Sequence, residues 1–409
     1  MGAEGTCEPR FATVREAFDR NLVERGEVGA SVCVTVDGEC VVDLWGGVAD
    51  PSTGRAWDRD TIGVVWSCTK GAVALMAHRL VADGRLDLDA PVVDYWPEFG
   101  KHDKDTITVR VLLSHQAGLA ALREPIPEDG LADWDLVVDQ LAAQEPLWPP
   151  GTRVGYHALT FGHLVGELIR RIDGRSPGTY FREEVAGPLG LDFWIGLPAE
   201  HESRVAPTIP ADPPGPDDAV PEFFVRAMTD PTSIPFLVAA NSGGLLLPGA
   251  IDRPAIHAAE IPAANGVANG RALAQLYRPL ALGGAVDGVV MLDPTTLAEA
   301  TRVAAATAVD ATIGLPTRWG LGFMRAVDNT RLGGVEDSVL LSDDAFGHSG
   351  LGGSLGFADP GARLSFGYTM NKHGRGVGGN VRCQALVDAV YRTLGYRQPD
   401  GGGIWLAAA

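Results

Sequence analysis

The sequence of 409 residues has few cysteines, few lysines and no long apolar run. Its five cysteines form no Cys-x-x-Cys pair, so reduced thiols are expected. Its nine histidines include no His-Glu-x-x-His pattern, which argues against a zinc hydrolase, and no Gly-x-x-x-x-Gly-Lys loop is present to bind a phosphate. The sequence therefore predicts neither a metal nor a cofactor.

Positive charge is also scarce, because 33 basic residues stand against 52 acidic ones and the net charge is −19. Such a chain repels polyanions, which argues against nucleic acid and anionic membranes as partners. No basic and apolar leader is evident, and no run approaches the roughly 20 apolar residues of a membrane span. We therefore expect a cytoplasmic globular protein. Nothing in the sequence indicates its oligomeric state.

The most informative stretch is Ser67-Cys68-Thr69-Lys70, in a chain with only four lysines. Residues three apart on a helix share a face, with about 5–6 Å between their Cβ atoms, so the Lys70 amine can reach the Ser67 hydroxyl. The run 71–84 predicts a helix that begins near Ser67. A desolvated lysine at such a helix start can act as a base. The motif alone leaves open that Ser67 only caps the helix and that Lys70 is a surface charge.

Acyl transfer also needs a proton relay for the leaving group, which Tyr156 could supply. Tyr156 follows a Pro/Gly turn at 149–155 and directly precedes a predicted helix at 159–172. Held near a cationic Lys70, Tyr156 would have a lowered pKa and could shuttle a proton. The alternative is an aromatic side chain that only packs.

A glycine-rich stretch at 346–353 could bind the substrate, because small residues let a ligand approach the edge of a strand. His348 could orient the tyrosine or contact the substrate. The Leu351 amide could pair with that of Ser67 as an oxyanion hole. The alternative is an ordinary turn with one polar histidine. The residues assigned to substrate and oxyanion binding are His348, Ser349, Gly350 and Leu351.

Two other serines lie beside histidines. Ser114-His115 has no acidic third member at a recognisable spacing, and Ser349 lacks the second glycine of Gly-x-Ser-x-Gly. Neither is predicted to be the nucleophile. Aromatic residues of the middle region could line an apolar acyl pocket or belong to the core: Trp134, Trp148, Trp194, Phe223, Phe224 and Phe236.

The residue patterns predict both helices and strands at each end of the chain, and they predict a mainly helical middle. Predicted helices are 11–25, 271–282 and 381–394, and predicted strands are 28–37, 40–45, 319–327, 352–357 and 363–370. We expect an α+β protein in which residues 8–70 and 306–396 form an antiparallel sheet domain flanked by helices. Residues 71–305 would form an inserted, mainly helical domain, and 397–409 a tail. The junction of two such domains is a natural place for a ligand cleft.

The order of these motifs resembles that of serine hydrolases of the class C β-lactamase and penicillin-binding-protein superfamily, and looks closest to the family VIII carboxylesterases. Supporting stretches are 112–119, 186–192 and 319–323, so the resemblance covers about residues 10–395. It implies a class C β-lactamase-like fold and a small-molecule ester as substrate. It also implies Ser67 as the acylated nucleophile, Lys70 as its base partner and Tyr156 as general base and acid.

Two positions depart from the lactam-recognising form of this family. Such members usually carry Lys-Thr-Gly where this chain has His348-Ser349-Gly350, and the Tyr-x-Asn pattern ends in Ala158. A lysine and an asparagine there would help hold a lactam's carboxylate and amide, so their absence favours neutral esters. Three other functions stay open: an acyltransferase, a β-lactamase or D-amino peptidase, and a binding protein that keeps the scaffold without catalysis.

Overall fold

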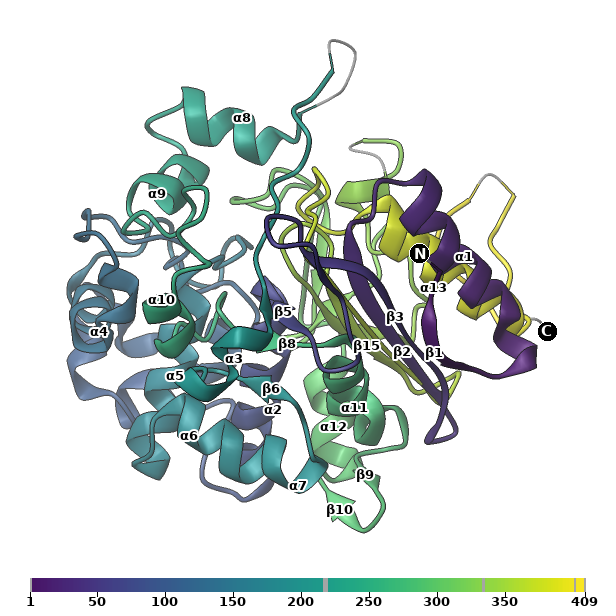
Figure 1. Cartoon of the computed structure of the whole chain (residues 1–409). Coiled ribbons are helices and arrows are strands. Elements are labelled where there is room, and N and C mark those ends of the chain that lie inside the picture. Colours follow the sequence, from purple (N-terminus) through teal and green to yellow (C-terminus); the bar gives the residue numbers. More distant parts are fainter. Residues whose placement is uncertain (1, 216–219, 333–334, 401, 408–409) are drawn as a thin grey trace.

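The computed structural model describes residues 2–215, 220–332, 335–400 and 402–407. A large antiparallel sheet crosses the molecule and carries helices on both faces (Figure 1). The helices nearest the two termini, α1 (Ala12–Glu24) and α13 (Val381–Thr393), lie side by side on one face. A mainly helical region lies beyond the other face. This is the α+β architecture that the sequence predicted.

The large sheet is built from both ends of the chain. Its order is β1-β3-β2-β16-β15-β14-β13-β12-β11, and neighbouring strands are antiparallel throughout. The N-terminal end meets the C-terminal end where β2 pairs with β16, with Ala30 opposite Met370. The strands are β1 (Glu4–Cys7), β2 (Gly29–Val36), β3 (Glu39–Asp50), β11 (Ala305–Thr307), β12 (Thr317–Trp319), β13 (Met324–Arg325), β14 (Phe346–Ser349), β15 (Leu355–Asp359) and β16 (Leu364–Met370).

Alternate side chains of β2 serve the two faces of this sheet. Val32 and Val34 join the core beneath α1 and α13. Ser31 points to the opposite face, where its hydroxyl accepts the first amide of α11 (Gly270–Ala281) at 2.9 Å. Gly367 of β16 lets this helix approach, because a Cβ there would lie 2.1 Å from the Gly270 oxygen.

Helix α2 (Thr69–Ala82) forms the centre of the helical region. Every residue from Thr69 to His78 is buried, and a helix that is enclosed on all sides makes a rigid support. It packs against α5 (Thr160–Asp173). The remaining helices are α3 (Val109–Leu113), α4 (Trp134–Ala143), α6 (Pro177–Phe181), α7 (Gly187–Leu189), α8 (Glu222–Thr229), α9 (Ile234–Ala240), α10 (Pro254–Ala258) and α12 (Pro294–Thr301). None of the helices in the described residues is long and apolar enough to cross a membrane.

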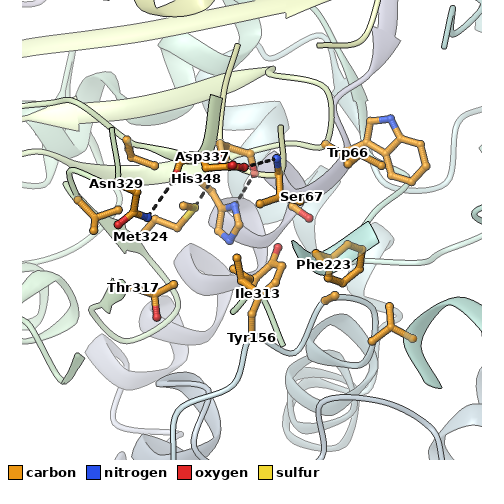
Figure 2. A pocket seen from close by; sticks show the side chains of 18 of the residues that line it. Trp66, Ser67, Tyr156, Phe223, Ile313, Thr317, Met324, Asn329, Asp337 and His348 are labelled. Carbon is orange, nitrogen blue, oxygen red and sulfur yellow. Dashed lines mark hydrogen bonds between the residues drawn. The ribbon is translucent and has the colours of Figure 1, made fainter. Parts of the chain in front are cut away.

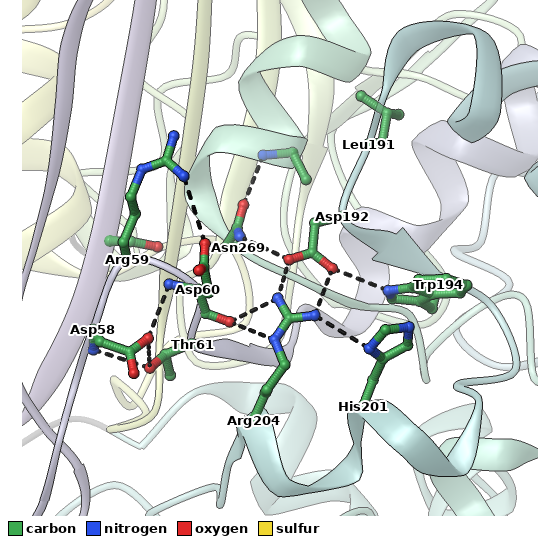
Figure 3. Close-up of polar contacts among 12 residues, drawn as sticks. Asp58, Arg59, Asp60, Thr61, Leu191, Asp192, Trp194, His201, Arg204 and Asn269 are labelled. Carbon is green, nitrogen blue, oxygen red and sulfur yellow. Dashed lines mark hydrogen bonds and ion pairs between the residues drawn. The ribbon is translucent and has the colours of Figure 1, made fainter.

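A second sheet, of order β6-β8-β5-β7, fixes the segment that leads into α2. Beside it, Arg204 donates to the backbone oxygen of Asp60 and pairs with Asp192, which also accepts from Asn269 (Figure 3). These contacts tie β5 to the helical region. The short strands are β4 (Arg55–Ala56), β5 (Ile62–Val64), β6 (Phe193–Trp194), β7 (Val205–Ala206), β8 (Val267–Ala268), β9 (Ala285–Val286) and β10 (Val289–Val290).

Three of the predicted strands are wrong in detail. The strand predicted at 40–45 continues to Asp50. The segment 319–327 is not one strand, because a turn separates β12 from β13, with Gly322 at a φ of +87° and the Gly320 amide bonded to the Phe323 oxygen. The strand predicted at 352–357 begins only at Leu355, since the glycines before it form a turn.

The division into a sheet domain and a helical domain stays a prediction. Helix α11 falls within the segment 71–305 expected to be helical, yet it packs on β2, β15 and β16 of the sheet. Trp405, in the expected tail, is buried against the ring of Tyr391. Residues 401, 408 and 409 of that tail lie outside the described residues.

Candidate active site

Ser67 lies in a sharp turn, Trp66–Cys68, that leads into α2. Trp66 has a φ of +48°, a conformation that bulky residues rarely adopt. The Thr69 hydroxyl holds this bend, because it donates to the Trp66 oxygen at 2.5 Å and accepts the Gly266 amide at 2.9 Å. Cys68 points away into the core, where burial raises the pKa of its thiol to about 12. Ser67 is therefore the side chain that the turn presents to solvent-accessible space.

Lys70 is completely buried beneath Ser67. Its Nζ lies 2.9 Å from Ser67 Oγ and 2.7 Å from each of the backbone oxygens of Ala158 and Ala263. Burial lowers the pKa of Lys70 well below its usual range. A neutral amine has two hydrogens and one lone pair, and carbonyl oxygens can only accept. The two carbonyls therefore take both hydrogens and leave the lone pair facing the Ser67 hydroxyl, which is the arrangement of a base.

Tyr156 points its hydroxyl toward Ser67 from the opposite wall (Figure 2). Its ring stacks on Trp319 with centroids 5.2 Å apart, and Lys70 Nζ lies 4.9 Å from its centroid. Burial raises the pKa of Tyr156, and the hydrogen bond with Ser67 offsets only part of that rise. The expected lowering of this pKa is therefore wrong. Because Lys70 is itself kept neutral, no cation is present to stabilise a phenolate, and Tyr156 retains its proton at neutral pH.

Asp310 fixes the backbone of Tyr156. Its buried carboxylate accepts the Tyr156 amide at 2.9 Å and the Thr317 hydroxyl at 3.0 Å. The ring of His115 adds an edge contact, with centroids 5.2 Å apart. Sequence reasoning missed Asp310, since a single aspartate in a loop far along the chain carries no pattern. Ser114, beside His115, donates to the Arg110 oxygen at 2.8 Å and accepts from Gln116 Nε2 at 2.8 Å, so neither contact is with a base.

Strand β14 brings His348 and Ser349 to the same site. His348 is buried and donates from Nδ1 to the Ser349 oxygen at 2.7 Å. Burial lowers the pKa of His348 to about 3, so the ring is neutral. Its Nε2 is an acceptor with no partner among the described residues, and its ring lies 5.9 Å from that of Tyr156. The structure thus brings the three predicted motifs together.

The turn after β14 approaches the segment before Ser67. The Gly353 amide bonds to the Gly350 oxygen at 2.9 Å, and Gly352 has a φ of +82°, which is typical of a type II turn. A Cβ at Gly350 would lie 2.2 Å from the Val65 oxygen, so the two segments touch through their backbones. Leu351 and Ser67 both line the adjoining cavity. The pairing of their amides as an oxyanion hole stays a prediction.

The cavity beside Ser67 has a volume of about 170 Å³ and mostly apolar walls (Figure 2). Of the six aromatic candidates, Phe223 and Phe224 line it, whereas the indole of Trp134 bonds to Glu167 elsewhere. No lysine or arginine is among its lining residues within the described parts of the chain. Its further apolar lining includes Val238, Leu246, Ile313, Pro316, Val327 and Val339. The described residues contain no cluster of three histidine, cysteine or acidic side chains that could hold a metal.

A serine in contact with a buried lysine and facing a tyrosine, beside strand β14 of an antiparallel sheet, is the arrangement expected of a serine hydrolase. The beta-lactamase family model matches residues 14–390. The chain is 37% identical to the esterase/beta-lactamase LipL of Mycobacterium tuberculosis, over 90% of this chain and 82% of that protein. It is 30% identical to the esterase EstB of Burkholderia gladioli, over 93% and 95% of the two chains. The chain therefore belongs to the beta-lactamase family, which confirms the resemblance inferred from the motifs.

Solved structures agree with this assignment. A family VIII carboxylesterase superposes with a TM-score of 0.84 at 40% identity, and covers 96% of this chain and 100% of its own. A penicillin-binding protein homologue from Caulobacter crescentus gives a TM-score of 0.83 at 39% identity, over 96% and 100% of the two chains. The class C β-lactamase-like fold predicted from the sequence is confirmed.

Proposed function

We propose that this protein hydrolyses carboxylic esters of small molecules through a covalent acyl intermediate on Ser67. Relatives named as esterases support the reaction class. The observation that carries the assignment of the nucleophile is the contact of Lys70 with Ser67 Oγ at 2.9 Å, with both amine hydrogens directed to carbonyls. Ser349 is the other serine among the described residues that line this cavity, and its hydroxyl contacts the Met324 sulfur and not an amine.

In the acylation step, Ser67 Oγ bonds to the ester carbonyl carbon while Lys70 takes the hydroxyl proton. The amides of Ser67 and Leu351 stabilise the negative charge that develops on the carbonyl oxygen. Tyr156 gives its proton to the departing alcohol oxygen as the C–O bond breaks, and regains a proton from Lys70. Water then attacks the acyl group, loses its proton to the same relay, and releases the acid with Ser67 restored.

The cavity favours neutral esters over β-lactams. A lactam carboxylate would enter an apolar space whose described lining offers no cation, and burying an unpaired charge is costly. His348 cannot replace the missing lysine, because its lowered pKa keeps it uncharged. We therefore expect ester turnover to exceed nitrocefin turnover by a wide margin.

The test is the turnover of p-nitrophenyl butyrate by Ser67→Ala. Loss of such a nucleophile typically lowers the rate by about 10⁶, to the background level. Ser114→Ala is the matched control, since Ser114 also lies beside a histidine, but it bonds to the Arg110 and Val111 oxygens and the Gln116 side chain and does not line the cavity. Full activity of the control and none of Ser67→Ala, with unchanged circular dichroism of both, is expected. Retention of most activity by Ser67→Ala would overturn the assignment.

Acyl transfer to an amine or alcohol uses the same intermediate and differs only in the nucleophile that accepts the acyl group. The partition of one ester between acid and amide products, with and without an added amine, decides between hydrolase and transferase.

A further inference from the structure

His373 lies between the two backbone segments that carry the predicted oxyanion-hole amides. It follows β16 by three residues and does not line the cavity. On one side it contacts Trp66, which directly precedes Ser67. The indole nitrogen of Trp66 donates to His373 Nε2 at 3.1 Å, and the ring centroids are 5.8 Å apart in an edge-on arrangement.

On its other side, His373 packs against the turn that carries Leu351. A Cβ at Gly352 would lie 2.4 Å from two ring carbons of His373, so the imidazole rests directly on the backbone of this glycine. The next amide, that of Gly374, donates to the Gly352 oxygen at 2.8 Å. The ring of His373 therefore lies between Trp66 and the turn and contacts both.

The contact with Trp66 supports a strained conformation. A φ of +48° is strained at a bulky residue and persists only where surrounding contacts impose it. The imidazole can accept the indole hydrogen because burial lowers the pKa of His373 to about 4, with Arg382 and Lys372 adding to the effect. Its backbone amide donates to the Ile209 oxygen at 2.9 Å, which holds the backbone that carries the ring.

We propose that His373 is a positioning residue for ester hydrolysis, which holds the Ser67 amide and the Leu351 amide at the separation that an oxyanion requires. It acts by accepting the hydrogen bond of the Trp66 indole on one side and by packing against the backbone of Gly352 on the other. The proposal rests on the function proposed above.

The expected effect is on the chemical step. Loss of one oxyanion donor costs about 10²–10³ in kcat, and a donor that is displaced rather than lost should cost about tenfold to a hundredfold. KM should stay within about threefold, because the oxyanion forms only in the transition state.

The experiment compares His373→Leu, which removes the acceptor, with His373→Gln, whose side-chain oxygen can accept the indole hydrogen. Two rates are measured: kcat for p-nitrophenyl butyrate, and the rate of Ser67 labelling by a fluorophosphonate. His373→Leu should lower both about tenfold or more, and His373→Gln should restore both to within about threefold. Trp66→Phe removes the same hydrogen bond from the other side, so Trp66→Phe combined with His373→Leu should be no slower than the slower single variant.

His201→Leu is the matched control. His201 also packs on a tryptophan, Trp194, with centroids 4.6 Å apart, but in the polar cluster of Figure 3 and not beside Ser67. It should leave both rates within twofold. Strictly additive losses in the double variant, or equal rates in His373→Leu and the wild type, would overturn the proposal.

The two readouts separate this proposal from the proposed function. If Ser67 is labelled but no ester is turned over, the function is wrong, and the labelling rates still decide the role of His373. If Ser67 is not labelled in the wild type, both proposals fall. If His373→Leu does not fold, Trp66→Phe alone carries the test, since it must slow labelling about tenfold.

Discussion

Replacing Lys70 with methionine would keep an unbranched side chain, one atom shorter, and remove the amine that faces Ser67. Without this base, kcat/KM for p-nitrophenyl butyrate should fall by about 10³–10⁴, the upper part of the range for general-base catalysis. Such a loss corresponds to about 4–5.5 kcal/mol of transition-state stabilisation. The fold should persist, because methionine fills most of the same buried space with an apolar chain.

The pH dependence gives a second signature. Only the neutral amine of Lys70 can accept a proton, so wild-type activity should fall as the pH drops through the lowered pKa of this residue. Lys70→Met has no such group. Its residual activity should therefore lack the acid limb that Lys70 produces in the wild type.

Stability should change with pH in a direction that the burial of Lys70 fixes. Its folded pKa is lowered, whereas the unfolded value is about 10.4, so between the two the unfolded state holds one more proton. This group therefore makes the wild type more stable as pH rises, by about 1.4 kcal/mol per pH unit within that window. Methionine removes this dependence. In Lys70→Met the carbonyls of Ala158 and Ala263 lose their hydrogen-bond donor. Each unsatisfied carbonyl lowers the free energy of unfolding by about 1–3 kcal/mol, and this loss does not vary with pH.

Urea unfolding of both proteins at pH 7, 8 and 9, with stopped-flow kinetics at the same pH values, measures these effects. Lys104→Met is the matched control. Lys104 is also buried, donates to the backbone oxygens of Ala142 and Gln144, and has its pKa lowered by burial to about 8. It should alter stability between pH 8 and about 10 and leave activity intact. Activity of Lys70→Met within tenfold of the wild type, or an equal loss in Lys104→Met, would refute the role of Lys70.

Two further outcomes follow from the protonation states of buried groups. Tyr156→Phe keeps the stacking on Trp319 but has no proton to give, so the turnover of alkyl esters should fall by a factor of about 10²–10⁴. The turnover of p-nitrophenyl esters should fall less, because p-nitrophenolate leaves without a proton. Equal losses for both ester types would contradict the role of Tyr156 as the acid. Burial lowers the pKa of His163 to about 4, so this side chain stays neutral in the folded protein at pH 5–7. The unfolded chain takes up a proton on His163 below about pH 6.5. The free energy of unfolding therefore decreases as the pH falls. In urea unfolding, His163→Gln should therefore gain about 2 kcal/mol relative to the wild type between pH 7 and pH 5, and no relative gain would contradict the burial argument.

The parts of the site that the sequence predicted are those fixed by local geometry or by motif order. The Ser67–Lys70 spacing is a property of one helix start, so their contact could be foreseen. Tyr156 and His348 were found because their order along the chain resembles a known family, and the structure places both rings beside the same cavity.

The parts that the sequence did not predict depend on contacts between distant segments. Which backbone oxygens receive the Lys70 amine is decided by the packing of the segments around Ala158 and Ala263 against α2. The expected lowering of the pKa of Tyr156 is wrong because burial of Tyr156 raises it and burial disfavours the charge on Lys70, and a sequence displays neither burial. Asp310 and His373 contact the site from loops that are remote in the sequence, and neither belongs to a repeating pattern.

The same reasoning explains the errors in the fold. Strands such as β16 and helices such as α13 carry a long regular pattern of apolar residues, and their predicted bounds are within one residue of the observed ones. The run 319–327 has the composition of a strand, but Gly322 adopts a positive φ and the Leu321 amide bonds to the Ala300 oxygen. Tertiary contacts thus broke a segment that local preference alone would leave extended.

The central claim is that Ser67 carries the acyl group, and intact-protein mass spectrometry after acid quenching during turnover of p-nitrophenyl butyrate tests it most directly. We expect a fraction of the protein to gain one butyryl group, located by digestion to the peptide that contains Ser67, and no such gain in Ser67→Ala. A butyryl group on another residue, or an equal gain in Ser67→Ala, would contradict the account.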